Sequence, residues 1–183
     1  MKIVETPIKD LVIIEPNVFE DNRGYFMESY KKELLEPFSG PFYILQENES
    51  MSKKGALRGL HYQGPPTAQA KLVRCIQGEV LDVCVDIRRN SPTFLQSFSI
   101  RLSDVNKLQL FVPKGFAHGF ITLSETAVFS YKVNAPYSPK DEGGILWSDP
   151  SIDIDWVLDP SEYIISPKDQ KLPKVSDWIS PFE

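Results

Sequence analysis

Cysteine and histidine are both scarce in this chain of 183 residues, which contains two of each. Cys75 and Cys84 lie inside apolar runs of strand-like sequence, and neither has the spacing of a metal ligand. We interpret both as buried, reduced thiols, since free cysteine is among the most buried residue types. The cysteine content therefore provides no basis for a disulfide framework.

Long apolar runs and an excess of basic residues are also absent. No run approaches the length of a membrane span, and the segment Met1–Glu5 lacks the apolar stretch of a signal peptide. We therefore expect a cytoplasmic protein without a membrane partner. The formal net charge of −5 argues against nucleic acid as a partner, because phosphate-backbone binding needs a broad basic surface. A few converging Arg and Lys residues can still bind a small phosphorylated ligand.

Length and composition indicate one folded domain. Hydrophobic residues make up 42% of the chain and charged residues 25%, as in folded rather than disordered proteins. A chain of this length can bury one substantial core but not two comfortable ones. No internal repeat or low-complexity linker divides it, so we expect a single domain over residues 1–183.

Helical signals are rare, and the best covers Ser29–Phe38, ended by Pro37 and Gly40. Elsewhere, short β-type runs are separated by Gly, Pro, Asn and Asp, and their number predicts an all-β barrel or jelly roll without helical crossovers. After Pro139 the chain becomes irregular, which predicts a C-terminal wrap around the barrel. The expected strands cover residues 11–19, 42–46, 57–62, 71–76, 79–87, 94–102, 107–112, 119–123 and 127–133.

The run Val80–Arg88 alternates cleanly between two kinds of side chain. Val83, Val85 and Ile87 share one face of the expected strand. The opposite face carries Asp82, Cys84, Asp86 and Arg88. Acidic residues on one face and aliphatic residues on the other fit a small barrel whose interior holds a polar ligand.

His61 and His118 each lie in an unusual setting. Arg58 and Lys71 flank His61, and buried strands rarely carry cations without an anion to bind. Arg58 and His61 are an odd number of residues apart, so a regular strand would send them to opposite faces. If both face one cavity, a bulge must intervene, and we place it at Gly59.

Lys71 and Tyr131 each add a polar group to an expected strand. On 71–76 the residues of the same parity as Lys71 are Val73 and Cys75, so this strand can project one cation from an apolar face. The pattern around Tyr131 is that of a core aromatic, although its phenol can donate a proton beside a charged substrate. The residues alone thus predict a basic, histidine-containing polar cavity in a β-barrel.

A series of motifs resembles the dTDP-4-dehydrorhamnose 3,5-epimerase family over nearly the whole chain, in order. The motifs are residues 21–26 (DNRGYF), 46–52 (QENESMS), 58–63 (RGLHYQ), 65–66 (PP), Gln69, Lys71, 78–80 (GEV), 82–83 (DV), 86–88 (DIR), 91–94 (SPTF), 115–120 (GFAHGF), Tyr131, 147–150 (WSDP) and 166–169 (SPKD). Because several multi-residue motifs match in the same order, the probability of agreement by chance is very small.

The resemblance implies a fold and a reaction. The expected fold is a cupin-type jelly-roll barrel with short flanking helices, typically assembled as a homodimer. Independently of the resemblance, Arg23 lies in a turn-like segment well before the barrel motifs, and we expect it, with Phe26 and Glu28, to complete the site of the neighbouring subunit. The expected substrate is a dTDP-linked 4-keto-6-deoxyhexose, dTDP-4-dehydro-6-deoxy-D-glucose. Inversion at C3 and C5 gives dTDP-4-dehydro-L-rhamnose in dTDP-L-rhamnose biosynthesis.

The same resemblance implies roles for individual residues. His61 matches the catalytic base and Asp169 the carboxylate that orients it. Tyr131 matches the acid on the other face of the sugar, and Lys71 the cation beside the 4-keto oxygen. The positions that match the lining of the nucleotide-sugar site are Arg23, Phe26, Glu28, Gln46, Asn48, Arg58, Lys71, His118, Glu142 and Lys168.

Neither a cofactor nor a metal is expected. No glycine-rich dinucleotide fingerprint is present. Metal-binding cupins use a His-x-His pair, and here Gln63 stands at the second position of that pair. His61 and His118 leave the ligand set short.

Other function classes remain open at this stage. An enzyme of the same fold that inverts one carbon only would share His61 and Tyr131, whereas a ketoisomerase would diverge from these motifs. A non-catalytic sugar-nucleotide-binding cupin would lack His61, Lys71 or Tyr131, and a metal-dependent dioxygenase would need further ligands. The segment Glu33–Tyr43 follows no family motif, and Pro167 departs from the residue found in many relatives.

Overall fold

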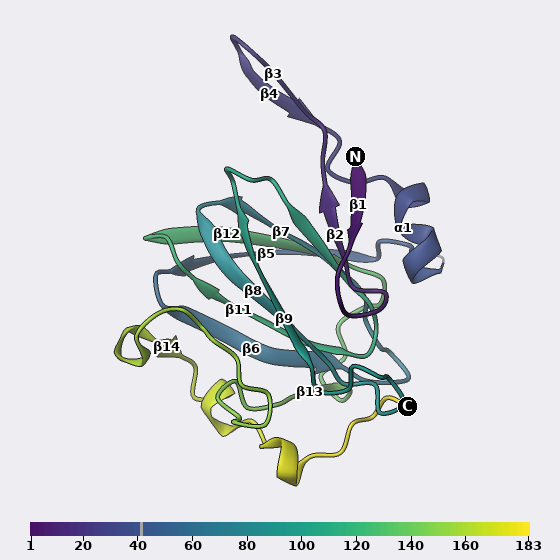
Figure 1. Cartoon of the computed structure of the whole chain (residues 1–183), viewed down its shortest axis with the longest axis vertical. Helices are drawn as coiled ribbons and strands as arrows, with labels where there is room; N and C mark the ends of the chain where they lie inside the picture. Colours follow the sequence, from purple (N-terminus) through teal and green to yellow (C-terminus); the bar gives the residue numbers. More distant parts are fainter. Residues whose placement is uncertain (41) are drawn as a thin grey trace.

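The computed structural model describes residues 1–40 and 42–183, so Pro41, within the segment that follows no motif, lies outside the described residues. The architecture is the predicted all-β one: two sheets face each other, and a β-hairpin extends beyond them (Figure 1). No helix in the described part of the chain is long and apolar enough to cross a membrane.

The first sheet, sheet I, has six antiparallel strands. In spatial order they are β1 (Lys2–Glu5), β2 (Val12–Glu15), β10 (Gln109–Val112), β7 (Lys71–Gln77), β12 (Thr126–Val133) and β5 (Gln46–Lys53). Sheet II contains β13 (Glu142–Gly144), β6 (Ala56–Gln63), β11 (Phe116–Thr122), β8 (Glu79–Asp86) and β9 (Ser97–Ser103), and β14 (Ile164–Ile165) pairs in parallel with β6.

The remaining elements lie outside the two sheets. The hairpin consists of β3 (Val18–Asp21) and β4 (Gly24–Met27). The described residues also form one α-helix, α1 (Lys32–Ser39), which lies near β1 and shares a buried cluster with β2, and three 3-10 turns at 160–162, 169–171 and 175–177. The predicted helix is confirmed, although it begins at Lys32 rather than at Ser29, and Pro37 lies inside it rather than ending it.

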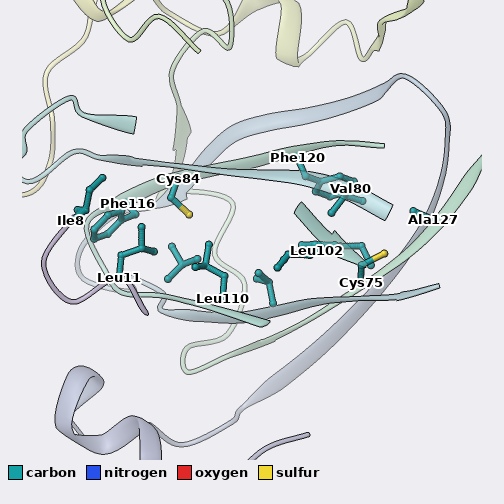
Figure 2. Close-up of a cluster of buried hydrophobic side chains, with 13 residues drawn as sticks. Ile8, Leu11, Cys75, Val80, Cys84, Leu102, Leu110, Phe116, Phe120 and Ala127 are labelled. Atoms are coloured by element: carbon teal, nitrogen blue, oxygen red, sulfur yellow. The ribbon is translucent and has the colours of Figure 1, made fainter. Parts of the chain in front are cut away.

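The apolar residues form three layers. One cluster fills the space between the sheets and includes Leu110, Phe120 and Phe129 (Figure 2). A second covers the outer face of sheet II, where Trp156 and other residues of the predicted C-terminal wrap pack. The third lies between the outer face of sheet I and α1. A fully buried aliphatic or aromatic side chain contributes roughly 1.5–3 kcal/mol, so these layers hold the sheets rigidly enough to position a site.

Strand β8 follows the predicted alternation. Val83, Val85 and Ile87 lie in the outer cluster, whereas Cys84 lies in the cluster between the sheets. On β7, Val73 and Cys75 also belong to the inner cluster, as their parity predicts. Both cysteines are free and buried, which confirms the interpretation as reduced thiols.

The prediction of a strand over residues 42–46 is wrong. Residues 42–45 are irregular, and β5 begins at Gln46 and continues to Lys53. Its sequence, QENESMSK, has low β-propensity, yet it pairs with β12 along its full length. Ladder pairing with a strongly apolar neighbour overrides local propensity here. Similarly, the predicted strand 11–19 is divided between β2 and β3.

Candidate active site

A cavity of about 540 Å³ opens between the two sheets. Sheet II supplies Arg58, His61 and His118 to its wall, and sheet I supplies Lys71 and Tyr131. The C-terminal segment closes one side with Lys168 and Asp169, among other residues. The polar, histidine-containing cavity predicted from the residues is therefore present, with cationic groups on both walls.

A kink in β6 brings Arg58 and His61 to the same cavity. The pairing with β11 joins His118 to His61 and Phe120 to Arg58, so two residues of β6, Gly59 and Leu60, oppose one of β11. Gly59, in the middle, has φ +133°, and a Cβ there would lie 2.6 Å from the Cα of Gly119. The bulge predicted at Gly59 is confirmed, and only glycine fits its backbone and its close contact.

His61 is held by Asp169, which is 108 residues away in sequence. The distance from Nε2 of His61 to Oδ1 of Asp169 is 2.7 Å, and the Asp169 side chain is 5% exposed. The Gly59 N–H donates to the other carboxylate oxygen. Burial acts to raise the pKa of Asp169, but the hydrogen bonds from His61, Gly59 and Ser166 outweigh it and the net pKa is lowered. The ionised carboxylate thus fixes the imidazole by Nε2 and leaves Nδ1 free.

Lys71 and Tyr131 lie on the opposite wall from His61. Burial lowers the pKa of Lys71, and no other described residue forms a hydrogen bond or salt bridge with its ammonium group. Burial also raises the pKa of Tyr131, so its phenol keeps its proton near neutral pH. One wall therefore carries a base with its carboxylate, and the other carries a protonated acid and a poorly solvated cation.

At the rim of the cavity, the Glu142 carboxylate connects two other side chains by hydrogen bonds. Its Oε2 accepts hydrogen bonds from Lys168 Nζ at 2.7 Å and from the Tyr137 hydroxyl at 2.9 Å. On β5, the Gln46 side-chain amide donates to Asn48 Oδ1, and Asn48 pairs with Tyr131 across the strands. Gln46, Asn48 and Glu142 thus border the site but are not among the residues that line the cavity.

The structure does not bring Arg23, Phe26 and Glu28 to the cavity of their own chain. Arg23 and Phe26 lie in the β3–β4 hairpin, which projects away from the sheets, and Glu28 follows it (Figure 1). Arg23 pairs with Asp21 at 2.5 Å, and its side chain is 85% exposed.

Several residues at the site were not among the predicted site residues. Phe120 and Phe129 form an apolar wall of stacked rings, with centroids 4.4 Å apart. Tyr137 reaches the rim through two hydrogen bonds, from its hydroxyl to Glu142 and from its backbone N–H to Gln46 Oε1. Asp82, fully buried, accepts hydrogen bonds from His118 Nε2 at 2.9 and 3.0 Å. The inward parity of Asp82 was visible in the sequence, but its partner on β11 was not.

This arrangement suits proton transfer next to a carbonyl group. A base removes a proton adjacent to a ketone, a nearby cation stabilises the enolate oxygen, and an acid on the other side returns a proton. The pair His61–Asp169 has the geometry of an oriented base, Lys71 is a cation on the facing sheet, and Tyr131 is a protonated acid. Arg58 and Lys168 add positive charge for an anionic ligand.

Comparisons with known proteins agree with this geometry. A profile of the dTDP-4-dehydrorhamnose 3,5-epimerase family matches residues 5–177. A dTDP-4-dehydrorhamnose 3,5-epimerase from Shigella flexneri is 54% identical over 157 residues, 85% of this chain and 87% of the relative. The crystal structure of a dTDP-4-dehydrorhamnose 3,5-epimerase from Elizabethkingia anophelis has 50% identity and a TM-score of 0.92, covering 97% of both chains. The structure of a dTDP-6-deoxy-D-glucose-3,5-epimerase from Legionella pneumophila, in complex with dTDP-4-keto-L-rhamnose, has 45% identity and a TM-score of 0.90, covering 96% of this chain and 93% of that one.

Proposed function

The chain belongs to the dTDP-4-dehydrorhamnose 3,5-epimerase family and is an epimerase of dTDP-rhamnose biosynthesis with a cupin fold, and from this premise we propose which of its residues perform the reaction. The observation that carries the proposal is the placement of His61, with Asp169, on sheet II and of Tyr131 on sheet I. A sugar ring between the sheets would have a base on one face and an acid on the other.

His61 is the base in this proposal. Carbons 3 and 5 both neighbour the 4-keto group, so removal of either proton gives an enolate with its charge on O4. Asp169 keeps the imidazole oriented through Nε2, and Nδ1 takes the proton. A single histidine can serve both carbons in turn, since both flank the same ketone.

Lys71 stabilises the enolate oxygen, and Tyr131 returns the proton. A desolvated ammonium group gains more from a developing negative charge than a solvated one does, because water no longer screens it. The raised pKa of Tyr131 keeps its proton available for delivery from the opposite wall. Reprotonation on that face inverts the carbon.

The ligand that fits the remaining groups is a dTDP-linked 4-keto-6-deoxyhexose. Arg58 and Lys168 place positive charge at the cavity, as a diphosphate requires. Phe120 and Phe129 offer an apolar surface suited to a sugar methyl group. The Legionella relative binds a sugar nucleotide of this chemical class.

The hairpin residues extend the proposal to a homodimer. Arg23 and Phe26 are exposed on an arm that leaves its own sheets, and Phe26 is 67% exposed. Such an arm can reach the cavity of a second copy of the chain. We propose that Arg23, Phe26 and Glu28 complete the nucleotide pocket of the neighbouring subunit, with Gln46, Asn48 and Glu142 at the rim of the subunit's own site.

The test is incubation with dTDP-4-dehydro-6-deoxy-D-glucose in deuterated water. Double inversion through enolates places one deuterium at C3 and one at C5 of the product, as counted by mass spectrometry and NMR. Label at a single carbon would show that the enzyme inverts one centre only. Absence of label would exclude the proposed proton transfer.

A further inference from the structure

Three side chains with metal-ligating atoms converge behind the wall of the active-site cavity. Asp82 and Cys84 project from β8, and His118 projects from β11. Cys84 and His118 are direct partners across the two strands, and Asp82 lies two residues away on the same face. The ligand atoms of all three lie within 4.8 Å of one another.

The three residues are buried, and the Cys84 thiol has no hydrogen-bond partner among the described residues. Asp82 and Cys84 are fully buried, and His118 is 7% exposed. His118 donates through Nε2 to both carboxylate oxygens of Asp82. Within the described residues the Cys84 thiol forms no hydrogen bond, whereas the Cys75 thiol donates to the carbonyl oxygens of Gln77 and Gly78. Cys84 therefore presents an unpaired sulfur beside an imidazole–carboxylate pair.

We propose that Asp82, Cys84 and His118 bind a soft divalent cation such as Zn²⁺, and that this binding inhibits the epimerase. Thiolate, imidazole and carboxylate are the ligands that Zn²⁺ takes in proteins, usually in a tetrahedral set. Three protein ligands leave one position for water or for a sugar oxygen. The soft thiolate ligand favours Zn²⁺ over Mg²⁺ or Ca²⁺, since the latter two prefer oxygen ligands alone.

The charges of the cluster support this choice. When Zn²⁺ binds, the thiol proton of Cys84 leaves to solvent, and the His118 proton moves from Nε2 to Nδ1, so the imidazole stays neutral and binds the metal through Nε2. The two positive charges are then balanced by the Asp82 carboxylate and the Cys84 thiolate. The occupied cluster is neutral overall, so it places no net positive charge beside the ammonium group of Lys71.

Inhibition follows from the place of His118. Its side chain lines the cavity, so a cation can enter through the cavity and reach Asp82 and Cys84 behind it. A metal held there draws the His118 ring away from its bond with Asp82 and presents an open coordination position to the sugar. Substrate and Zn²⁺ therefore exclude each other. The proposed catalytic roles of His61, Tyr131 and Lys71 require no metal, so the cation is an inhibitor rather than a cofactor.

Cobalt provides a direct readout of the site. Metal-free enzyme, prepared with a chelator and then freed of it, is titrated with Co²⁺, which gives a near-ultraviolet charge-transfer band when a thiolate binds it. The two cysteines supply a matched control, because both are buried and they lie well apart within the inner cluster (Figure 2). We expect the band in the wild type and in Cys75→Ala, and its loss in Cys84→Ala and Cys84→Ser. Absence of the band in the wild type, or its persistence in both Cys84 variants, would overturn the site.

The inhibition is tested separately by epimerase assays with added Zn²⁺. Chelator treatment should leave the basal rate unchanged, and Zn²⁺ should inhibit the wild type and Cys75→Ala in competition with the sugar nucleotide. Cys84→Ala should keep its basal rate and need at least about tenfold more Zn²⁺, since even losses outside the ligand shell weaken metal affinity roughly 10- to 100-fold. Equal inhibition of Cys84→Ala would refute the inhibitory role. The cobalt titration needs no substrate, so its result is independent of the proposed epimerase residues.

Discussion

At the scale of single residues, the cavity separates onto facing sheets the two side chains that we propose transfer protons. His61 is on β6 with Asp169 behind it, and Tyr131 is on β12. Opposite placement matters because inversion needs removal of a proton from one face and delivery to the other. Each role can be tested by a substitution that deletes the titratable group and keeps the shape of the side chain.

Replacement of His61 by Asn should abolish turnover. The asparagine occupies similar space but cannot accept the proton, and loss of a general base costs roughly 100- to 10,000-fold in rate. Measurement of product formation and of deuterium incorporation at C3 and C5 should show that both are lost, while circular dichroism shows an unchanged fold. Substantial remaining exchange would assign the base to another residue.

Replacement of Tyr131 by Phe should lower epimerised product more than it lowers proton exchange with solvent. Deprotonation by His61 still occurs, but delivery from the other wall does not. Tyr163→Phe is the matched control, because its hydroxyl bonds to the Leu158 carbonyl away from the cavity. Equal loss of product and exchange in Tyr131→Phe would indicate a packing role only.

At the scale of elements, the kink of β6 determines which side chains face the cavity. Leu57 and Leu60 both pack in the outer cluster, whereas Arg58 and His61 face inward, an order that a regular strand cannot produce. Gly59 makes the change of register by its positive φ and its contact with Gly119.

Replacement of Gly59 by Ala should destabilise the protein by more than about 2 kcal/mol, because a Cβ would meet backbone atoms and the φ is unfavourable. Urea unfolding provides the measurement. Gly24→Ala is the control, since Gly24 has φ +129° but nothing within 4 Å of the added Cβ. A Gly59→Ala variant no less stable than Gly24→Ala would contradict the packing argument.

The loop after β8 is held by Asp86. Its carboxylate accepts hydrogen bonds from Arg88 at 2.8 and 2.9 Å, and from Ser91 and Thr93 at 2.6 Å. Burial acts to raise the pKa of Asp86, but these bonds prevail and the net pKa is lowered. Because the pKa in the folded state is depressed, the stabilisation is complete above the unfolded value of about 3.9 and is lost as the pH falls through the folded value.

Replacement of Asp86 by Asn should therefore cost about 3 kcal/mol at pH 7, as expected when one partner of a buried ion pair is removed. Denaturant unfolding from pH 7 to pH 2 should show the difference from the wild type shrinking only below about pH 4. A difference that stays constant down to pH 2 would show that Asp86 is not the titrating group.

At the scale of the whole molecule, the β3–β4 hairpin exposes large apolar side chains, although Lys107 Nζ of the same chain lies 4.0 Å from the centroid of the Tyr25 ring. Phe19, Tyr25 and Phe26 are exposed on it, and Arg23 lies at its turn. Apolar surface of this kind on a protruding arm is typical of contact with a second chain. The proposed dimer places Arg23 in the neighbouring site. Because the net charge of the chain is −5, binding of a diphosphate depends on such local cations.

Mixing two inactive variants, Arg23→Ala and His61→Asn, should restore activity after subunit exchange. Each mixed dimer then contains one site with both groups intact, so random exchange recovers roughly a quarter of the wild-type activity. The control mixes His61→Asn with Lys71→Ala, whose residues line the same cavity of one chain, and should recover nothing. If the first mixture also stays inactive despite demonstrated exchange, Arg23 serves its own subunit.

The all-β class, the alternation of β8, the bulge at Gly59 and the family were determined by the sequence alone. Side-chain parity along a strand is a local property, so Asp82, Cys84 and Val83 could be assigned to faces without any coordinates. The epimerase motifs are short runs of consecutive residues, so they too can be recognised from the sequence without the structure.

Only the tertiary structure decided which distant residues meet. The strand β5 is polar in sequence and forms because β12 pairs with it along its full length. Residues 42–45, which looked more strand-like, form no strand, although the Leu45 N–H donates to the Val133 carbonyl oxygen at the end of β12. The bond of His61 to Asp169 and the convergence of Cys84 with His118 depend on which strands and segments lie side by side. Such contacts come from long-range pairing and burial, which no local pattern encodes.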